Sequence, residues 1–310
     1  MHQHGKSDST NRYRHVIEVI SINPLETKED LPTLEELESF KKESQKENYF
    51  LNIAKSITPH IINMDAVKEN ILLQLVGGVE HNDVRDYSNI FLVGDPSISK
   101  TQLLLAALKL EPKSMYSVGS GGSKAGLTIV SVRRPNGTWM AQVGDLPQCD
   151  KGLVACDEFD KMTKEDMDSM HEAMENGQCT NTKVVNVTLQ ARTKILAAAN
   201  LLKGKFDPLE SIRDQYDIPP SLLTRFDTIW NIIDEVSDIS DDLIGNQILA
   251  QYDENNSSTK GYFDYTQLRK LVAYTKKLKP TLNTKAKTKC LEFYKQIRRN
   301  TKKVTTIKCI

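Results

Sequence analysis

Residues 94–101 carry the clearest chemical pattern in this chain of 310 residues, because they read GDPSISKT between two apolar runs. The run before them, NIFLV, is typical of a buried strand, and the run after them, QLLLAAL, is typical of a helix. A tight loop at such a junction presents its amides and the amino terminus of the helix to an anion. In the usual pattern a lysine reaches the outer phosphates and a hydroxyl binds Mg²⁺, and Lys100 and Thr101 stand at these positions.

One residue departs from that pattern, since Ser99 stands where a second glycine is usual. Serine keeps a small side chain and a free amide, so we still predict a phosphate-binding loop. The alternative is a lysine–threonine pair that simply begins an ordinary helix.

A pair of acids supports the first interpretation. The segment GLVACDEFDKM is an apolar strand that ends in Asp157 and Glu158. Carboxylates at this place can complete the Mg²⁺ shell and polarise an attacking water, whereas either acid alone would be an ordinary solvated strand end. Together the loop and the acids predict a site that hydrolyses a nucleoside triphosphate.

Two more polar residues follow predicted elements. The run TKILAAAN ends in Asn200, whose amide can orient the water or touch the γ-phosphate, or can be a simple turn residue. The segment IPPSLLTRFD places Arg225 after a short helix. A lone arginine usually makes a surface ion pair, but this one can also reach the phosphate of a neighbouring subunit as an arginine finger.

Short apolar runs separated by helical stretches must position these residues. The strand candidates are NIFLV, SMYSV, GLVAC, TKILAAA and TIWNII. Buried strands that alternate with helices predict a mainly parallel sheet covered on both faces. We divide the chain into a polar N-terminal remnant and linker (1–50), an α/β core (51–236) and a lysine-rich, truncated helical lid (237–310). A helix over residues 66–76 is expected to end at Gly77 and Gly78.

The composition is that of an ordinary globular protein, with 39% hydrophobic and 26% charged residues. The 41 basic and 41 acidic residues cancel, so only local basic surfaces can favour a nucleic acid. The five cysteines are scattered without a CxxC pair, which argues against a zinc site or a disulfide framework. Since we find neither a signal peptide nor an apolar run of membrane-spanning length, we expect a soluble intracellular protein without a membrane partner.

In combination these segments resemble the ATPase module of the minichromosome maintenance (MCM) replicative helicases, which are AAA+ proteins. The resemblance runs from about residue 50 to residue 300 and rests, in order, on GDPSISKTQLL, GSGGSKAGLT, CDEFDKM with HEAMENG, LQARTKILAAAN and LLTRFD. The family loop uses alanine or glycine at the position of Ser99, so the serine is a mild departure. The implied fold is a P-loop NTPase: a mainly parallel sheet flanked by helices, with β-hairpin inserts and a small C-terminal helical lid.

The resemblance also implies roles for single residues. ATP with Mg²⁺ would lie between neighbouring subunits of a ring, usually a hexamer. Four residues would be catalytic in cis (Lys100, Asp157, Glu158 and Asn200), and Arg225 would act in trans. Thr101 and Asp157 would hold the Mg²⁺. The implied ATP-binding loop consists of Gly94, Asp95, Pro96, Ser97, Ile98, Ser99, Lys100, Thr101 and Gln102.

Two hairpins would point into the ring channel and contact DNA without sequence preference. The segment GLTIVSVRRPNGTWMAQVGDL corresponds to the helix insert of the family, and its PNGTW is independently a good hairpin turn. In CTNTKVVNVTLQAR, Lys183 falls where the family has a DNA-contacting lysine, although this hairpin is slightly short and lacks the family glycine. An exposed strand lysine is the alternative. Arg133 and Arg134 are the other local cations expected to neutralise phosphates.

The chain departs from the family pattern at both ends. Residues 1–50 resemble only the last strand and the linker of the N-terminal portion of the family. The chain stops at VTTIKCI, where the family begins a helix with a second trans arginine, and Lys308 stands near that place. These departures allow a fragment or a reduced paralogue.

We expect an enzyme, an ATP-hydrolysing DNA helicase motor of DNA replication that forms a homo- or hetero-hexamer with MCM subunits. The alternative is an accessory or reduced MCM paralogue that binds ATP and DNA and assembles with a full-length partner without unwinding alone. A nucleotide-dependent protein remodeller is a more distant alternative. The protein would be cytoplasmic in an archaeon or a virus and nuclear in a eukaryote.

Overall fold

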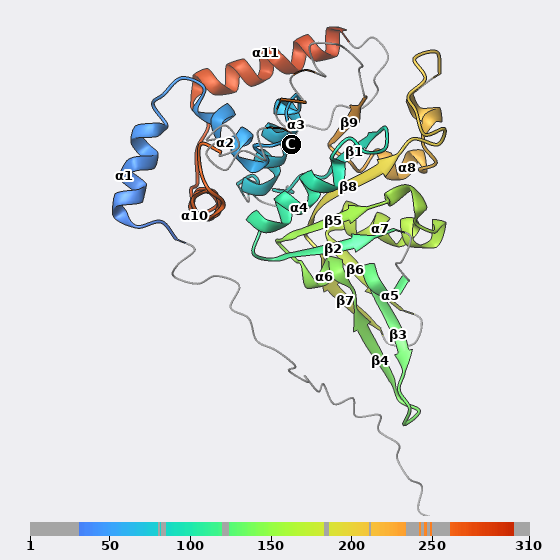
Figure 1. Ribbon diagram of the computed structural model, residues 1–310. Helices are drawn as coiled ribbons and strands as arrows, with labels where there is room; N and C mark the ends of the chain where they lie inside the picture. The colour runs from blue at the N-terminus through green and yellow to red at the C-terminus, as the bar shows by residue number, and fades with distance from the viewer. Residues whose placement is uncertain are drawn as a thin grey trace, which may run out of the picture.

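The computed structural model describes residues 31–79, 81, 85–119, 124–182, 186–210, 212–233, 242, 245–246, 249 and 261–300. Within them, a central sheet is sandwiched between two groups of helices, and two β-hairpins extend below it (Figure 1). The predicted P-loop NTPase fold class is confirmed. The division into an N-terminal remnant and linker, a core and a lid stays a prediction.

The central sheet has five strands in the order β2 (Ser114–Val118), β5 (Leu153–Asp157), β8 (Lys194–Asn200), β1 (Ile90–Gly94) and β9 (Thr228–Ile232). Every neighbouring pair in it is parallel. These are the five runs that the sequence predicts to be strands. Their continuous apolar character follows from burial on both faces: every residue of β1 is buried.

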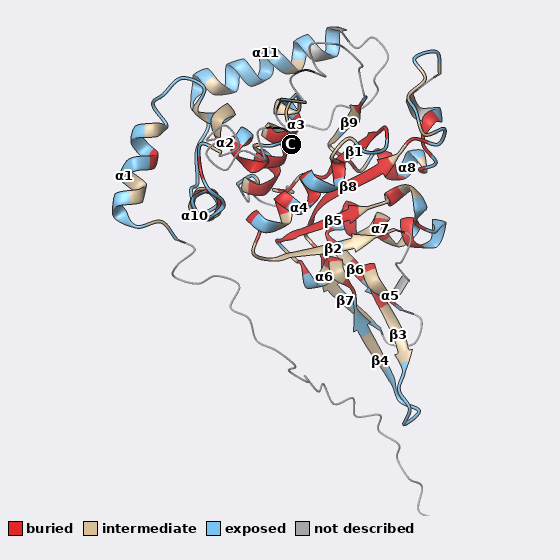
Figure 2. Cartoon of the chain, in the orientation of Figure 1, coloured by how far each residue is buried: buried red, intermediate tan, exposed pale blue. Residues whose placement is uncertain are grey.

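Alternate residues of the strands enter two separate cores, because side chains alternate across a strand. Ile90 and Leu92 belong to one core, and Phe91 and Val93 belong to the other. The first core is closed mainly by four helices: α2 (Tyr49–Ile57), α3 (Asp65–Val76), α4 (Lys100–Leu110) and α10 (Tyr265–Thr275). The second is closed mainly by α6 (Asp145–Gln148), α7 (Lys164–Asn176) and α8 (Pro220–Leu223). Figure 2 shows the buried residues concentrated in the sheet and in these inner helices.

The helix ends follow from local sequence signals. Helix α3 ends at Gly77, whose φ of 76° is in the left-handed region, as the sequence predicts. Thr163 caps the first turn of α7, and Asp264 forms a capping box with Gln267 at the start of α10. Lys276, at the end of α10, donates to Glu111 at the end of α4 over 2.6 Å.

The remaining elements are peripheral or short. Helix α1 (Leu34–Glu43) begins at a capping box on Thr33, and α11 (Thr284–Asn300) is mostly exposed. The short helices are α5 (Lys124–Leu127), η2 (Phe159–Lys161) and η3 (Ile212–Gln215). The described residues contain no helix that is both long enough and apolar enough to cross a membrane.

Two antiparallel hairpins complete the fold. The family resemblance implies both, and the turn residues independently predict the first. The first pairs β3 (Ile129–Arg133) with β4 (Trp139–Val143), and its turn includes Gly137 with a φ of 84°. The second pairs β6 (Gln178–Asn181) with β7 (Val187–Gln190). The tip of the first hairpin is exposed (Figure 2).

Candidate nucleotide-binding site

The sheet brings the predicted site residues together at one edge. Because its strands are parallel, their carboxyl ends meet there, and Gly94 lies level with Asn200 in the register. Asp157 ends β5 two strands away from β1, with β8 between them. All the residues that are predicted to act on a nucleotide in cis therefore lie at this edge of the sheet, or on the loop and helix that follow β1.

The loop between β1 and α4 begins at a residue that has to be glycine. A Cβ on Gly94 would lie 1.9 Å from the carbonyl oxygen of Ile232 in β9. The backbone N–H of Asp95 donates to that same carbonyl over 3.3 Å, and the Asp95 carboxylate accepts from the N–H of Phe206 over 3.0 Å. The loop is thus fixed to its neighbours on both sides.

Two residues of the loop adopt the left-handed backbone region that favours glycine. The φ angles are 67° at Ser97 and 53° at Ser99. The glycine that the usual pattern has at position 99 is explained by this conformation, which a serine adopts only at a free-energy cost. The serine departure is therefore compatible with the loop but strains it.

Lys100 is buried inside the loop, with 7% of its surface exposed. Its Nζ donates to the carbonyl oxygens of Gly94 over 2.9 Å and of Asp95 over 2.6 Å. Burial lowers the pKa of the ammonium, and the charge of Asp157 opposes this shift. The two carbonyl contacts hold the ammonium inside the loop.

A hydroxyl and a carboxylate from different elements meet beside the loop. Thr101, in the first turn of α4, donates its Oγ1 proton to Oδ2 of Asp157 over 2.6 Å. The backbone N–H of Glu158 donates to the other carboxylate oxygen over 2.8 Å, which fixes the orientation of the group. Hydroxyl and carboxylate oxygens, together with the phosphates of a nucleotide, are the ligands that Mg²⁺ takes in such sites, so this pair fits the ion.

No larger metal cluster competes with this pair, since the described residues contain no group of three or more His, Cys, Asp or Glu side chains that could hold a metal. Mg²⁺ does not require such a cluster, because it binds proteins through one or two carboxylates and substrate phosphates.

Tyr116 is a site residue that the sequence analysis missed. Its hydroxyl donates to Oδ2 of Asp157 over 3.0 Å, the same oxygen that accepts from Thr101. Burial, reinforced by the Asp157 carboxylate, raises the pKa of this phenol to about 12, so it stays a donor. The sequence indicates Tyr116 only as a polar residue within a predicted strand, and no motif spacing connects it to Asp157.

Glu158 and Asn200 lie beside this cluster. Glu158 has a left-handed backbone, with a φ of 49°, and its carboxylate accepts from Nζ of Lys161 over 3.1 Å. The Glu158 side chain is 34% exposed, so water reaches it. The backbone N–H of Asn200 donates to Asp160 over 3.1 Å, which ties the end of β8 to η2.

Arg225 does not lie at this edge. It follows α8 and precedes β9, and Thr228 at the start of β9 is level with Ile90 at the start of β1. Arg225 is thus at the amino edge of the sheet, roughly 15 Å from the loop at the strand rise of about 3.3 Å per residue. Its guanidinium pairs with Glu175 at 2.7 Å, and its buried Nε has no hydrogen-bond partner among the described residues.

The predicted DNA-contacting residues are only partly described. Arg133 ends β3 directly opposite Trp139, and Arg134 Nε lies 3.0 Å from the sulfur of Met140. Lys183 lies outside the described residues, between β6 and β7.

Comparison with known proteins shows which family the chain resembles. The MCM P-loop domain model matches residues 36–252. Similar curated proteins include the DNA replication licensing factor MCM6 of Arabidopsis thaliana, 34% identical over 274 residues, and that of Oryza sativa subsp. indica, 36% identical over 259 residues. The DNA replication licensing factor mcm6 of Schizosaccharomyces pombe is 32% identical over 271 residues.

These alignments cover most of this chain but a minor part of each relative. They include 86%, 81% and 85% of the chain, and 33%, 31% and 30% of the three relatives. The chain therefore spans about a third of the length of the curated relatives that it matches.

Proposed function

Since this chain belongs to the MCM family, we propose that it binds ATP with Mg²⁺ at residues 94–102 and hydrolyses it. The observation that carries the proposal is the hydrogen bond between Thr101 and Asp157 beside the buried Lys100. It joins a hydroxyl in the first turn of α4 to a carboxylate at the end of β5, beside the ammonium of Lys100. The strand that leads into α4, β1, is not a neighbour of β5 in the sheet.

Each group has a distinct task in this proposal. The loop amides and Lys100 bind the phosphates and stabilise the charge that develops on them. Thr101 and Asp157 hold Mg²⁺, which when bound neutralises charge on the β- and γ-phosphates. Glu158 accepts the proton of the attacking water at its carboxylate, and Asn200 orients that water.

We further propose that turnover needs a neighbouring MCM subunit, because Arg225 lies at the edge of the sheet away from its own loop. The relatives named above are replication licensing factors, and assembly into a ring with other MCM subunits would bring Arg225 to the phosphates of the next subunit. DNA would be contacted by Lys183, Arg133 and Arg134 on the two hairpins, without sequence preference. Eukaryotic relatives support a nuclear protein.

Two substitutions separate binding from hydrolysis. Lys100→Ala should weaken ATP binding at least about tenfold, because it removes a charged donor to the phosphates. Glu158→Gln should keep ATP affinity within about twofold and lower turnover at least about a hundredfold, the usual range for a lost general base. Fluorescent-nucleotide titration and phosphate release measure the two effects.

The matched controls are Lys41→Ala and Glu38→Gln on the exposed side of α1, which should change neither quantity. If Glu158→Gln turns over ATP as fast as the parent chain, Glu158 has no catalytic role. If Lys100→Ala binds ATP as tightly as the parent, the loop is not the nucleotide site.

The alternative is an accessory subunit that binds ATP and DNA without driving unwinding. It is distinguished by placing Glu158→Gln in this chain alone within an assembled MCM ring. A motor subunit should then lose most of the unwinding rate of the ring. Full unwinding activity in that ring would favour the accessory role.

A further inference from the structure

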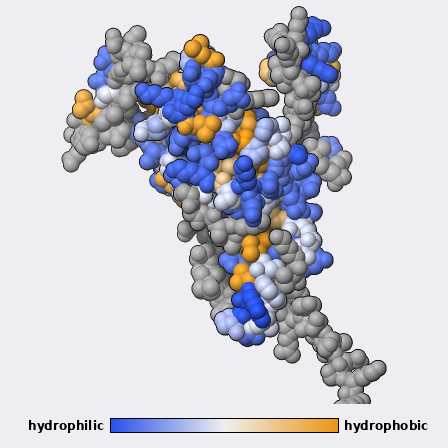
Figure 3. Space-filling model, turned by 90° about the vertical axis from the view of Figure 1, so that its right-hand side faces the viewer, coloured by the Kyte–Doolittle hydropathy of each residue, from blue (hydrophilic) through white to orange (hydrophobic). Residues whose placement is uncertain are grey.

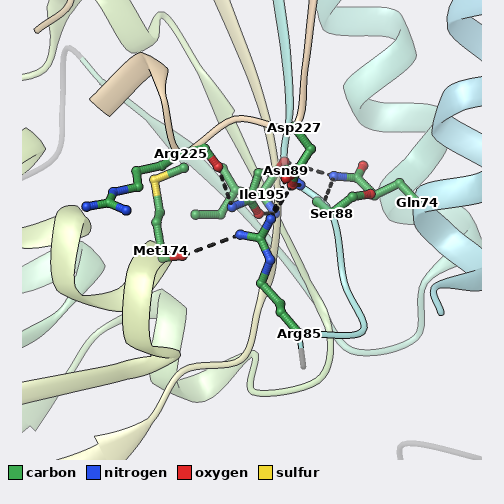
Figure 4. Close-up of polar contacts among 8 residues, drawn as sticks. All are labelled: Gln74, Arg85, Ser88, Asn89, Met174, Ile195, Arg225 and Asp227. Atoms are coloured by element: carbon green, nitrogen blue, oxygen red, sulfur yellow. Dashed lines mark hydrogen bonds and ion pairs between the residues drawn. The ribbon is translucent and has the colours of Figure 1, made fainter. Parts of the chain in front are cut away.

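A polar network at the amino edge of the sheet holds the turn that carries Arg225 (Figure 4). The Arg85 guanidinium donates to both carboxylate oxygens of Asp227, each over 2.5 Å, and to the carbonyl oxygen of Met174 over 3.4 Å. Only 2% of the Asp227 side chain is exposed. One terminal nitrogen, Nη2, contacts both oxygens of this buried carboxylate, and the other, Nη1, donates to the Met174 carbonyl. The planar guanidinium thus holds the carboxylate and the end of α7 through two separate nitrogens.

Asn89 connects the same turn to the sheet. Its side chain is buried, donates to the carbonyl oxygen of Arg225 over 3.3 Å and accepts from the N–H of Ile195 over 3.1 Å. Its backbone N–H donates to Asp227 over 2.8 Å, and its carbonyl accepts from the N–H of Asp227 over 2.9 Å. The backbone on both sides of Phe226 is therefore fixed to the start of β1.

The side chain of Arg225 is held by a residue that belongs to the same network. Glu175, which pairs with its guanidinium at 2.7 Å, follows Met174, whose carbonyl accepts from Arg85. Arg85 thus holds both the turn that carries Arg225 and the last turn of α7 that supplies its partner. The side of the molecule toward which α7 and α8 lie is largely hydrophilic, with small hydrophobic areas interspersed (Figure 3).

We propose that Arg85 is a positioning residue for trans catalysis: through Asp227 it sets the place from which Arg225 reaches the nucleotide of a neighbouring subunit. The inference rests on the proposed function, in which Arg225 acts in trans. Loss of Arg85 leaves the buried Asp227 carboxylate without its positively charged partner, so the turn must shift or admit water. Misplacement of a catalytic group by about 1 Å can lower a rate about a hundredfold.

The first test separates this role from a general structural one. In an assembly in which the parent chain turns over ATP, Arg85→Gln should lower turnover between about tenfold and a hundredfold. ATP affinity should stay within about twofold of the parent, since the loop lies at the opposite edge of the sheet. Arg85→Lys keeps the charge but has a single nitrogen for Asp227 and the Met174 carbonyl, and should fall between the parent and Arg85→Gln.

The matched control is Arg192→Gln. Arg192 also pairs with a carboxylate at the amino edge, since its Nε and Nη2 donate to Asp150 over 3.0 and 2.7 Å, but the described contacts of that pair do not include residues 225–227. It should keep turnover within about threefold of the parent. Equal losses in Arg85→Gln and Arg192→Gln, or a loss of ATP affinity in Arg85→Gln, would overturn the proposal.

Mixed assemblies test the trans direction. Rings that contain both Arg85→Gln and Lys100→Ala copies should regain activity, because some interfaces pair an intact loop with a well-placed Arg225. Rings that contain Arg85→Gln and Arg225→Ala copies should not, since both defects lie on the same edge. Recovery in the second mixture, or none in the first despite confirmed co-assembly, contradicts the assignment.

Hydrogen exchange gives a readout that does not depend on hydrolysis. In Arg85→Gln, the amides of residues 225–228 should exchange at least about tenfold faster, and those of 95–101 should exchange as in the parent. If the parent chain does not hydrolyse ATP, the proposed function fails, while this result still decides whether Arg85 holds the turn. Unchanged exchange at 225–228, or faster exchange in both segments, would overturn the positioning role.

Discussion

The strained backbone of the phosphate loop gives a sharp prediction at Ser99. Its φ of 53° and ψ of 17° place it in the left-handed region. That region costs an L-residue about 1–2 kcal/mol, which Ser99→Gly would remove. The glycine in turn makes the unfolded chain more flexible, which favours unfolding by about 0.4–1 kcal/mol. The net effect of Ser99→Gly should be a stabilisation of about 0.5–1 kcal/mol.

The effect is measurable by urea unfolding and by the melting temperature, which should rise by about 1–3 °C. ATP affinity should stay within about threefold of the parent, because glycine keeps the amide that faces the anion. Ser44→Gly is the matched control. Ser44 has a φ of −63° and donates to the carbonyl oxygen of Lys41, so glycine there should lower stability by up to about 1 kcal/mol.

A fall in stability for Ser99→Gly would refute the reasoning, because it would mean that the serine makes contacts worth more than the relieved strain. The reasoning would also fail if both serine substitutions changed the free energy of unfolding equally. In that case the backbone angle at position 99 would have no energetic consequence.

Three further predictions concern other parts of the chain. Lys183→Ala should lower the log–log salt slope of single-stranded DNA binding by about 0.7, and an unchanged slope with assembly intact would make it a bystander. Burial lowers the pKa of Lys68 from 10.5 to about 8. Between pH 8 and 9 the unfolded chain therefore binds more protons than the folded chain, so the free energy of unfolding should rise with pH in urea titrations. Lys68→Met should reduce that rise. The prediction for Lys68 would be contradicted if the stability of the parent fell over this pH range and that of Lys68→Met fell by the same amount. Tyr116→Phe should raise several-fold the Mg²⁺ concentration needed for tight ATP binding, whereas Tyr262→Phe should not; equal titrations for the two would remove Tyr116 from the site.

The sheet was predictable from the sequence because its strands are buried on both faces. NIFLV and TKILAAA read as continuous apolar runs, and the structure pairs β1 with β8 as parallel neighbours. The first hairpin was equally predictable, since PNGTW contains the turn residues that its connection requires. Local sequence is sufficient in both cases because burial and turn geometry are properties of short segments.

The network around Arg225 was not predictable in the same way. Arg85 and Asp227 are 142 residues apart in the chain, and no motif spacing connects them. They meet only because β1 and β9 are neighbours in the sheet, so that the residues before each strand lie at the same edge. The contact of Tyr116 with Asp157 was not predictable for the same reason, because it depends on the pairing of β2 with β5. Such contacts depend on strand order, which a single sequence does not reveal.

The strand order also limits what one copy of the chain can do. Lys100, Thr101 and Asp157 lie at the carboxyl edge of the sheet, and Arg225 lies at the amino edge, so the length of β1 separates them. No rotation of a side chain covers that distance, since a fully extended arginine reaches only about half of 15 Å from its own backbone. If Arg225 acts on a phosphate, as we propose, the phosphate belongs to another molecule. Each copy then contributes the phosphate loop to one site and Arg225 to another. The geometry of each site depends on how rigidly Arg85 and Asn89 hold the turn that carries Arg225.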